Sequence, residues 1–107
     1  MSEIEIDGKL RRITFSYNAV ADAEKEADMG FASMMSENRI GFHVLRILLW
    51  AGMKAHEPGL TVQRTGMLID SYLGNDGTLD KLMETIMKAV QESKMFAKSG
   101  NVEAGGE

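Results

Sequence analysis

Apolar and polar residues alternate in the first part of the chain, as they do in a strand with one buried face. The apolar members of this pattern are Ile4, Ile6, Leu10, Ile13 and Phe15. Between them stands Asp7-Gly8, a pair that readily takes the two positive φ angles of a type I′ turn. The pattern therefore predicts a β-hairpin over about residues 3–15. Its apolar face needs cover from helices or from a partner, because an isolated hairpin is only marginally stable in water.

The pattern becomes helical after residue 16. Ser16 or Asn18 is suited to cap a first helix, because a short polar side chain accepts a hydrogen bond from a free backbone amide at a helix start. We expect this helix to run to about Met29 and to stop at Gly30. Its outer face carries the acidic residues Asp22, Glu24, Glu26 and Asp28. The interpretation that we favour is a solvated face without a function of its own.

A connector at residues 31–36, with room for one helical turn and a cap at Ser36, leads to a central helix predicted at residues 37–56. One apolar stripe of this helix consists of Ile40, Val44, Ile47, Leu48 and Ala51. Further apolar residues widen this stripe almost all the way round the helix: Leu45, Leu49, Trp50 and Met53. A helix of this kind must be covered on several sides, by its own fold or by a partner. We therefore expect Trp50 to be largely buried. The helix must end before Pro58-Gly59, since proline cannot continue the hydrogen-bond ladder.

Two more helices are predicted after this proline. Thr61 caps a shorter helix that stops at the turn of residues 74–77, and Thr78 caps the last helix. The last helix has the clearest amphipathic pattern, formed by Leu79, Leu82, Met83, Ile86, Val90 and, at its end, Phe96. Residues 99–107 are rich in glycine without periodicity, which predicts a disordered tail. The predicted fold is mainly α, an N-terminal β-hairpin followed by about four helices, in a single domain at residues 1–98.

The composition restricts the classes of partner. The 107 residues carry a net charge of −4, whereas binding a phosphate backbone over a broad surface requires many Lys and Arg. No apolar stretch approaches the roughly 20 residues that span a bilayer, so we expect no membrane partner. The chain has no cysteine and no N-terminal secretory pattern, which favours a cytoplasmic location.

Candidate catalytic chemistry is sparse. The only imidazoles belong to His43 and His56, which are too far apart on one predicted helix to share a metal ion. Neither lies in a catalytic signature, and His56 suits the negative end of the helix dipole. The chain also contains none of the glycine-rich patterns that bind phosphate groups. These features predict a protein that is not an enzyme, holds no metal or other cofactor and takes no small-molecule substrate.

Two other features bear on protein binding. The chain has nine methionines, whose flexible side chains suit a surface that repacks against a partner but fill core gaps equally well. The predicted protein-binding residues are Leu45, Leu49, Trp50, Met53 and Met67. The basic cluster Lys9, Arg11 and Arg12 either contacts an acidic surface or a nucleic-acid backbone or, as we favour, protects an edge strand from aggregation.

Residues 48–73, LLWAGMKAHEPGLTVQRTGMLIDSYL, resemble the central segment of the tail assembly chaperones of long-tailed bacteriophages, prophages and gene transfer agents. In these families an apolar helix with a Leu-Trp/Tyr-Ala-like end is followed by an acidic-Pro-x-Leu-Thr turn and another helix. The matching positions here are Leu49, Trp50, Ala51, Gly52, His56, Glu57, Pro58, Leu60 and Thr61. The strand at residues 10–15 and the helix after it also resemble the opening segment of the family, so that the likeness covers about residues 9–97.

The resemblance implies a specific function, whereas the residue pattern alone predicts only a helical protein that binds another protein. It implies a protein that binds the tape measure protein and tail tube subunits in the cytoplasm of a bacterial host during tail assembly. The family has no catalytic residues to transfer to this chain, and a homo-oligomer is left open. An apolar central helix and a surplus of methionines suit a protein that shields hydrophobic surface on another chain.

The alternative function is that of a small DNA-binding regulator. In this interpretation the helix at residues 61–73 enters the DNA groove after the Pro58-Gly59 turn. Only Gln63 and Arg64 are available there for base or phosphate contacts, while Asp70 repels phosphate. The charge of this helix therefore makes the regulator the less favoured hypothesis.

Overall fold

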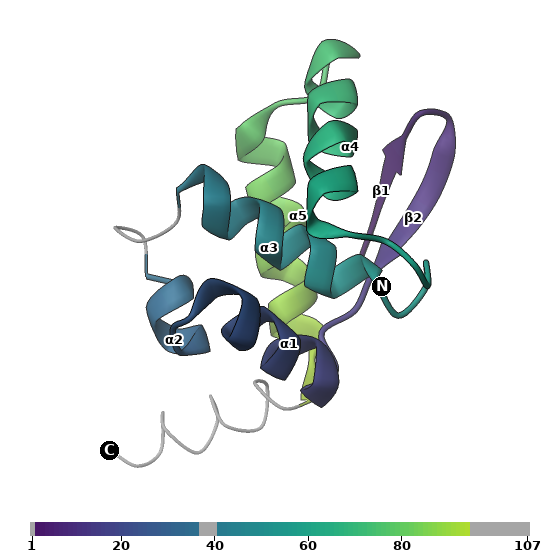
Figure 1. Ribbon diagram of the computed structural model, residues 1–107. Coiled ribbons are helices and arrows are strands. Elements are labelled where there is room, and N and C mark those ends of the chain that lie inside the picture. The colour runs from purple at the N-terminus through teal and green to yellow at the C-terminus, as the bar shows by residue number, and fades with distance from the viewer. Residues whose placement is uncertain (1, 37–40, 95–107) are drawn as a thin grey trace.

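The computed structural model describes residues 2–36 and 41–94, which form a two-stranded hairpin followed by five helices (Figure 1). The strands are β1 (Ser2–Ile6) and β2 (Lys9–Ile13), and the helices are α1 (Tyr17–Ala27), α2 (Phe31–Met34), α3 (Phe42–Met53), α4 (Val62–Gly74) and α5 (Leu79–Glu92). This confirms the predicted fold class. The short helix α2 is the single helical turn that was considered for the connector at residues 31–36.

The hairpin has the turn that its sequence predicts. β1 and β2 pair antiparallel, and Asp7 and Gly8 between them have φ angles of 57° and 74°. This register pairs Glu5 with Leu10, and directly opposite residues share a face of the sheet. Leu10 therefore faces outward with Glu5 and is 60% exposed, so its assignment to the apolar inner face was wrong.

The inner face of the hairpin lies against the helices (Figure 1). Ile4, Ile6 and Ile13 are buried, with β1 against α4 and α5 and β2 against α3. The Ser2 hydroxyl donates to the carboxylate of Glu92 in α5 at 3.0 Å, which joins the two ends of the described chain. The cover that the hairpin requires thus comes from the protein's own helices.

Helix α1 begins as predicted and ends earlier. Ser16 is its N-cap and accepts a hydrogen bond from the Ala19 amide. Its C-cap is Asp28, in the left-handed conformation at φ 57°, so the prediction of a stop at Gly30 was wrong. Gly30 instead precedes α2, where the Glu24 carboxylate accepts the Phe31 amide at 2.7 Å.

Helix α3 is the centre of the core. It packs against α1, α4, α5 and β2, and eight of its twelve residues are buried. Its cap is Gly41 and its last residue is Met53, so the predicted end near His56 was three residues too late. Gly41 is extended and precedes the first residue of α3, so the predicted cap at Ser36 was wrong. Residues 37–40, where the helix was predicted to start, lie outside the described residues. Trp50 is only partly buried, and its indole Nε1 donates to the Leu60 carbonyl at 3.0 Å.

The predicted caps of the last two helices are confirmed. Thr61 accepts a hydrogen bond from the Arg64 amide, and Thr78 accepts one from the Lys81 amide. Helix α5 buries Leu82, Ile86 and Ala89, whereas Thr65 is the only fully buried residue of α4. Helix α4 is therefore the least covered of the long helices. The predicted positions of Phe96 and of the tail at residues 99–107 lie outside the described residues.

Candidate protein-binding groove

A groove of about 430 Å³ lies between α3 and α4, and the first residue of α5 also lines it. Its lining is Phe42, His43, Leu45, Arg46, Gly66, Ile69, Asp70, Leu73 and Leu79. The groove exists because α4 covers only part of the apolar circumference of α3. We refer to these residues as the α3–α4 groove.

Exposed apolar side chains gather at this groove. Within the described ranges, six large hydrophobic residues are exposed, and three of them line the groove: Phe42 at 79%, Leu73 at 36% and Leu79 at 37%. A fourth, Met67, is 67% exposed and lies beside the groove, three residues before Asp70 on α4. Scattered apolar residues are ordinary on a protein surface, but a cluster of this kind is typical of an interaction site.

The cation of the groove is Arg46, which is partly buried. Its side chain packs on Gly66 of α4, where an added Cβ would lie 3.1 Å from the Arg46 Cδ. Its Nη2 lies 3.3 Å from the Nδ1 of His43, while its buried Nε has no hydrogen-bond partner in the described part of the chain. A missing Cβ on α4 thus makes room for a guanidinium between two helices.

No carboxylate neutralises Arg46 within the described residues. The ion pairs of this part of the chain join Arg11 to Glu57, Arg12 to Glu3 and Lys54 to Asp22. Asp70 also lines the groove but lies beyond ion-pair distance of Arg46. The groove therefore presents an unpaired guanidinium among apolar side chains.

Three of the five predicted binding residues lie in the core. Leu49 and Met53 have no exposed surface, and Leu45 is only 6% exposed at the floor of the groove. Trp50 packs against the core and is joined to Leu60 through its indole. The apolar surplus of α3 is thus covered mostly by the protein itself, and Met67 alone of the five is well exposed.

Apart from Leu45, the sequence interpretation did not identify the residues of the groove as binding residues. Leu79 was placed in the amphipathic pattern of the last helix, and neither Phe42 nor Leu73 was singled out as a binding residue. All three lie at helix ends, where neighbouring elements provide less cover. The signal that could have identified them is an apolar side chain next to a helix boundary.

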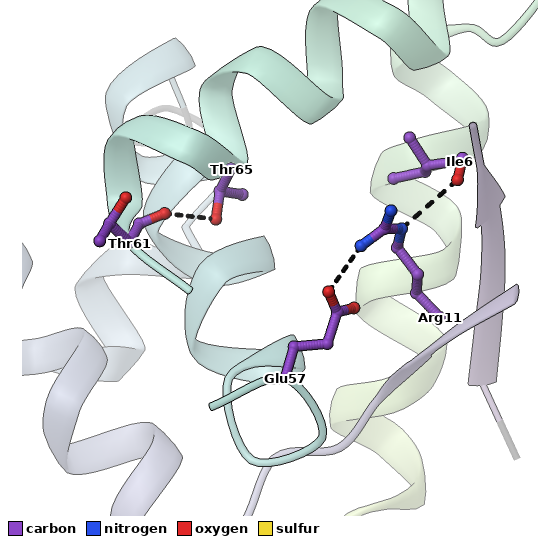
Figure 2. Close-up of polar contacts among 5 residues, drawn as sticks. All are labelled: Ile6, Arg11, Glu57, Thr61 and Thr65. Carbon is purple, nitrogen blue, oxygen red and sulfur yellow. Dashed lines mark hydrogen bonds and ion pairs between the residues drawn. The ribbon is translucent and has the colours of Figure 1, made fainter. Parts of the chain in front are cut away.

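The basic cluster of the hairpin is largely occupied by internal contacts. Figure 2 shows the Arg11 guanidinium between two acceptors, the Glu57 carboxylate at 2.5 Å and the Ile6 carbonyl at 3.4 Å. The side chains of Arg11 and Glu57 are only 11% and 16% exposed. Arg12 lies 3.9 Å from Glu3. Arg11 therefore joins β2 to the connection between α3 and α4 and is not available as a surface cation.

The two histidines make separate polar contacts. The Nε2 of His56 lies 2.9 Å from the Thr14 hydroxyl, and the Nδ1 of His43 contacts Arg46. Within residues 2–36 and 41–94 there is no cluster of three or more His, Cys, Asp or Glu placed to hold a metal ion. In the same ranges no helix has the length and apolar character needed to cross a bilayer.

A second hollow, of about 800 Å³, lies between the hairpin turn and the α4–α5 turn. Its lining is mostly polar and includes Glu5, Asp7, Asn75, Asp76 and Lys81, and the Ser71 hydroxyl donates to Asp7 across it. Such side chains are already hydrated, and a protein partner gains less by covering them than by covering apolar surface. The smaller α3–α4 groove is therefore the better candidate for a binding site.

Comparison of the chain with protein-family models, with curated proteins and with solved structures finds no match.

Proposed function

We propose that this protein is a tail assembly chaperone of a bacteriophage or prophage, which binds the tape measure protein and tail tube subunits in the host cytoplasm. The proposal combines the sequence resemblance at residues 48–73 with one structural observation, the exposed apolar α3–α4 groove. In this role the protein acts by binding alone and performs no chemical step.

The residues that carry the resemblance occupy one place in the fold. They form the last turns of α3, the connection after it and the start of α4. In this connection Glu57 pairs with Arg11, and the carbonyl of Thr61, the N-cap of α4, accepts from the Thr65 hydroxyl at 2.8 Å (Figure 2). The Leu60 carbonyl accepts from the indole of Trp50. These contacts set the angle between the two helices that border the groove. The shared motif therefore supports the proposal through the shape of the binding surface.

The groove suits a helical partner with an apolar face. A helix places side chains at i, i+3, i+4 and i+7 on one side, and a groove between two helices accepts such a row. Covering an exposed side chain such as Phe42 or Met67 contributes roughly 1 to 3 kcal/mol. A few such contacts are enough to keep a partner bound in solution. The partner dissociates when a larger surface of the growing assembly competes for the same apolar side chains.

The direct test is co-expression with the cognate tape measure protein. We expect a soluble complex and less aggregation of the tape measure protein than in its absence. A pull-down of tape measure fragments and tail tube subunits at low and high salt should show retention under both conditions, because hydrophobic contacts are insensitive to moderate salt. Duplex DNA is the rival ligand in the same experiment.

The DNA-binding alternative predicts the opposite behaviour. Gln63 and Arg64 are exposed on the first turn of α4, but Asp70 is exposed on the same helix. Binding through phosphate contacts weakens steeply as salt rises. Retention of DNA at low salt only, together with no retention of either tail protein, would replace the chaperone proposal with the regulator.

A further inference from the structure

We infer that the α3–α4 groove binds an amphipathic helix that carries a carboxylate among its apolar side chains, and that Arg46 pairs with this carboxylate. The inference rests on the proposed function, because it names the chemistry by which the chaperone recognises its partner. It adds a specificity-determining residue to an otherwise apolar surface.

The first step concerns the state of Arg46 in the free protein. A buried charged group is ordinarily paired or fully hydrogen-bonded, because leaving water is unfavourable for it. Arg46 is partly buried, its Nε lacks an acceptor, and its one polar contact in the described residues is with the ring nitrogen of His43, which carries no negative charge. A carboxylate brought by a partner would supply the missing counter-charge.

The second step concerns the order of this side chain. Arg46 lies against Gly66, and His43 on the preceding turn of α3 contacts its Nη2. A guanidinium held in this way loses less rotamer freedom on binding than a mobile surface lysine does. Its planar set of donors also matches the two oxygens of a carboxylate. At Arg46 the groove therefore favours an acidic side chain of the partner over an apolar one.

The third step concerns direction. Asp70 lies on the opposite wall of the same groove, on α4. It repels a carboxylate, so the acidic residue of the partner helix must lie on the Arg46 side. Charges placed this way favour one register and one direction of the bound helix. An apolar groove without them would accept a helix in several registers.

The experiment uses the full-length protein and pairs of labelled synthetic amphipathic helices. The two peptides of a pair differ only at one position of the apolar face, which is Glu in one peptide and Gln in the other. This position differs from pair to pair, so that together the pairs sample the length of the helix. We expect at least one Glu peptide to bind the wild type about tenfold or more tightly than its Gln partner, as for a hydrogen bond to a charged group. In Arg46→Gln this preference should disappear, and Arg46→Lys should restore part of it.

The matched control is Arg64→Gln. Arg64 is an exposed arginine on α4 that does not line the groove, so the variant removes the same charge from the protein while leaving the groove intact. It should keep the preference for the Glu peptide. Thermal melting of all variants verifies that each is folded, and binding of the Gln peptide to Arg46→Gln verifies that the apolar groove persists.

The outcomes separate this inference from the proposed function. Equal binding of Glu and Gln peptides, or no binding of any peptide, overturns the role of Arg46 even if the tape measure protein is retained. A Glu preference that depends on Arg46, in a protein that ignores both tail proteins, supports the groove chemistry and refutes the chaperone role. Self-association of the chain that is abolished by Phe42→Ser would identify a second copy as the occupant and overturn the inference.

Discussion

The backbone N–H of Thr14 donates to the carbonyl oxygen of Gly52 at 2.7 Å, which joins the end of β2 to the last turn of α3. The final carbonyls of a helix lack amides from a following turn, and this bond satisfies one of them. Gly52 also allows the two segments to touch. A Cβ at this position would lie 2.6 Å from the Ile13 Cγ2 and 3.2 Å from the Phe15 ring.

We therefore expect Gly52→Ala to destabilise the protein although alanine favours helices. The added methyl group forces α3 away from the hairpin, and overpacking of this kind costs about 1–3 kcal/mol. Urea denaturation measures the loss. Gly74→Ala is the control, because a Cβ at Gly74 in α4 meets no atom within 4 Å, and its stability should be unchanged or slightly higher. Equal changes in the free energy of unfolding for the two substitutions would show that the close contact at Gly52 does not affect stability.

The second prediction concerns the pair of Arg11 and Glu57. Arg11→Met leaves the mostly buried Glu57 carboxylate without its cation, and breaking a buried pair costs about 3 kcal/mol or more. The double variant Arg11→Met/Glu57→Met leaves no uncompensated charge and should be more stable than Arg11→Met alone. A double-mutant cycle in urea measures the coupling. Additive losses would mean that the two side chains do not interact in solution.

The third prediction concerns pH. The hydrogen bond from Ser2 favours the ionised form of Glu92 and holds the pKa of this carboxyl below its ordinary value. Ser2→Ala should raise this pKa, as followed by NMR titration. A lowered pKa in the folded state contributes stability above the ordinary glutamate pKa, which is about 4.3. That contribution is lost as pH falls through the pKa of the folded protein, so the stability difference between wild type and Ser2→Ala should shrink in acid.

The fourth prediction tests the groove as the site of the proposed function. Phe42→Ser and Met67→Ser each remove apolar surface from the groove or its edge, and each should weaken binding of a tape measure fragment about tenfold. Both side chains are exposed, so their loss should change the free energy of unfolding by less than about 0.5 kcal/mol.

Tyr17→Ser is the matched control for this prediction. Tyr17 is 74% exposed, close to the 79% of Phe42, but it lies on α1 outside the groove. Calorimetric titration with the same fragment should give wild-type affinity for this variant. A loss of binding as large as that of Phe42→Ser would move the binding site away from the groove.

The features that the sequence predicts well are those decided by neighbouring residues. The turn at Asp7-Gly8 and the caps Ser16, Thr61 and Thr78 depend on φ angles and hydrogen bonds within a few positions. Each is present in the structure where the local pattern places it. The overall order of hairpin and helices follows from these boundaries.

The features that the sequence predicts poorly depend on packing between distant segments. Leu10 faces outward because the register pairs it with Glu5, which the apolar pattern alone does not determine. Leu49 and Met53 were predicted to bind a partner, but α1, α4, α5 and β2 surround the helix that carries them. The sequence shows that an apolar helix needs cover and leaves open which surface remains uncovered.

The packing of β1 against α5 sets an order of events during synthesis. β1 is the first of the described elements to be translated, yet α5, one of the two helices against which β1 packs, is the last of them. Until α5 leaves the ribosome, the hairpin has no complete apolar cover, and contacts between such distant segments form late. Leu79 at the start of α5 also lines the α3–α4 groove. A nascent chain therefore acquires its complete binding surface and its stable hairpin at the same moment of translation.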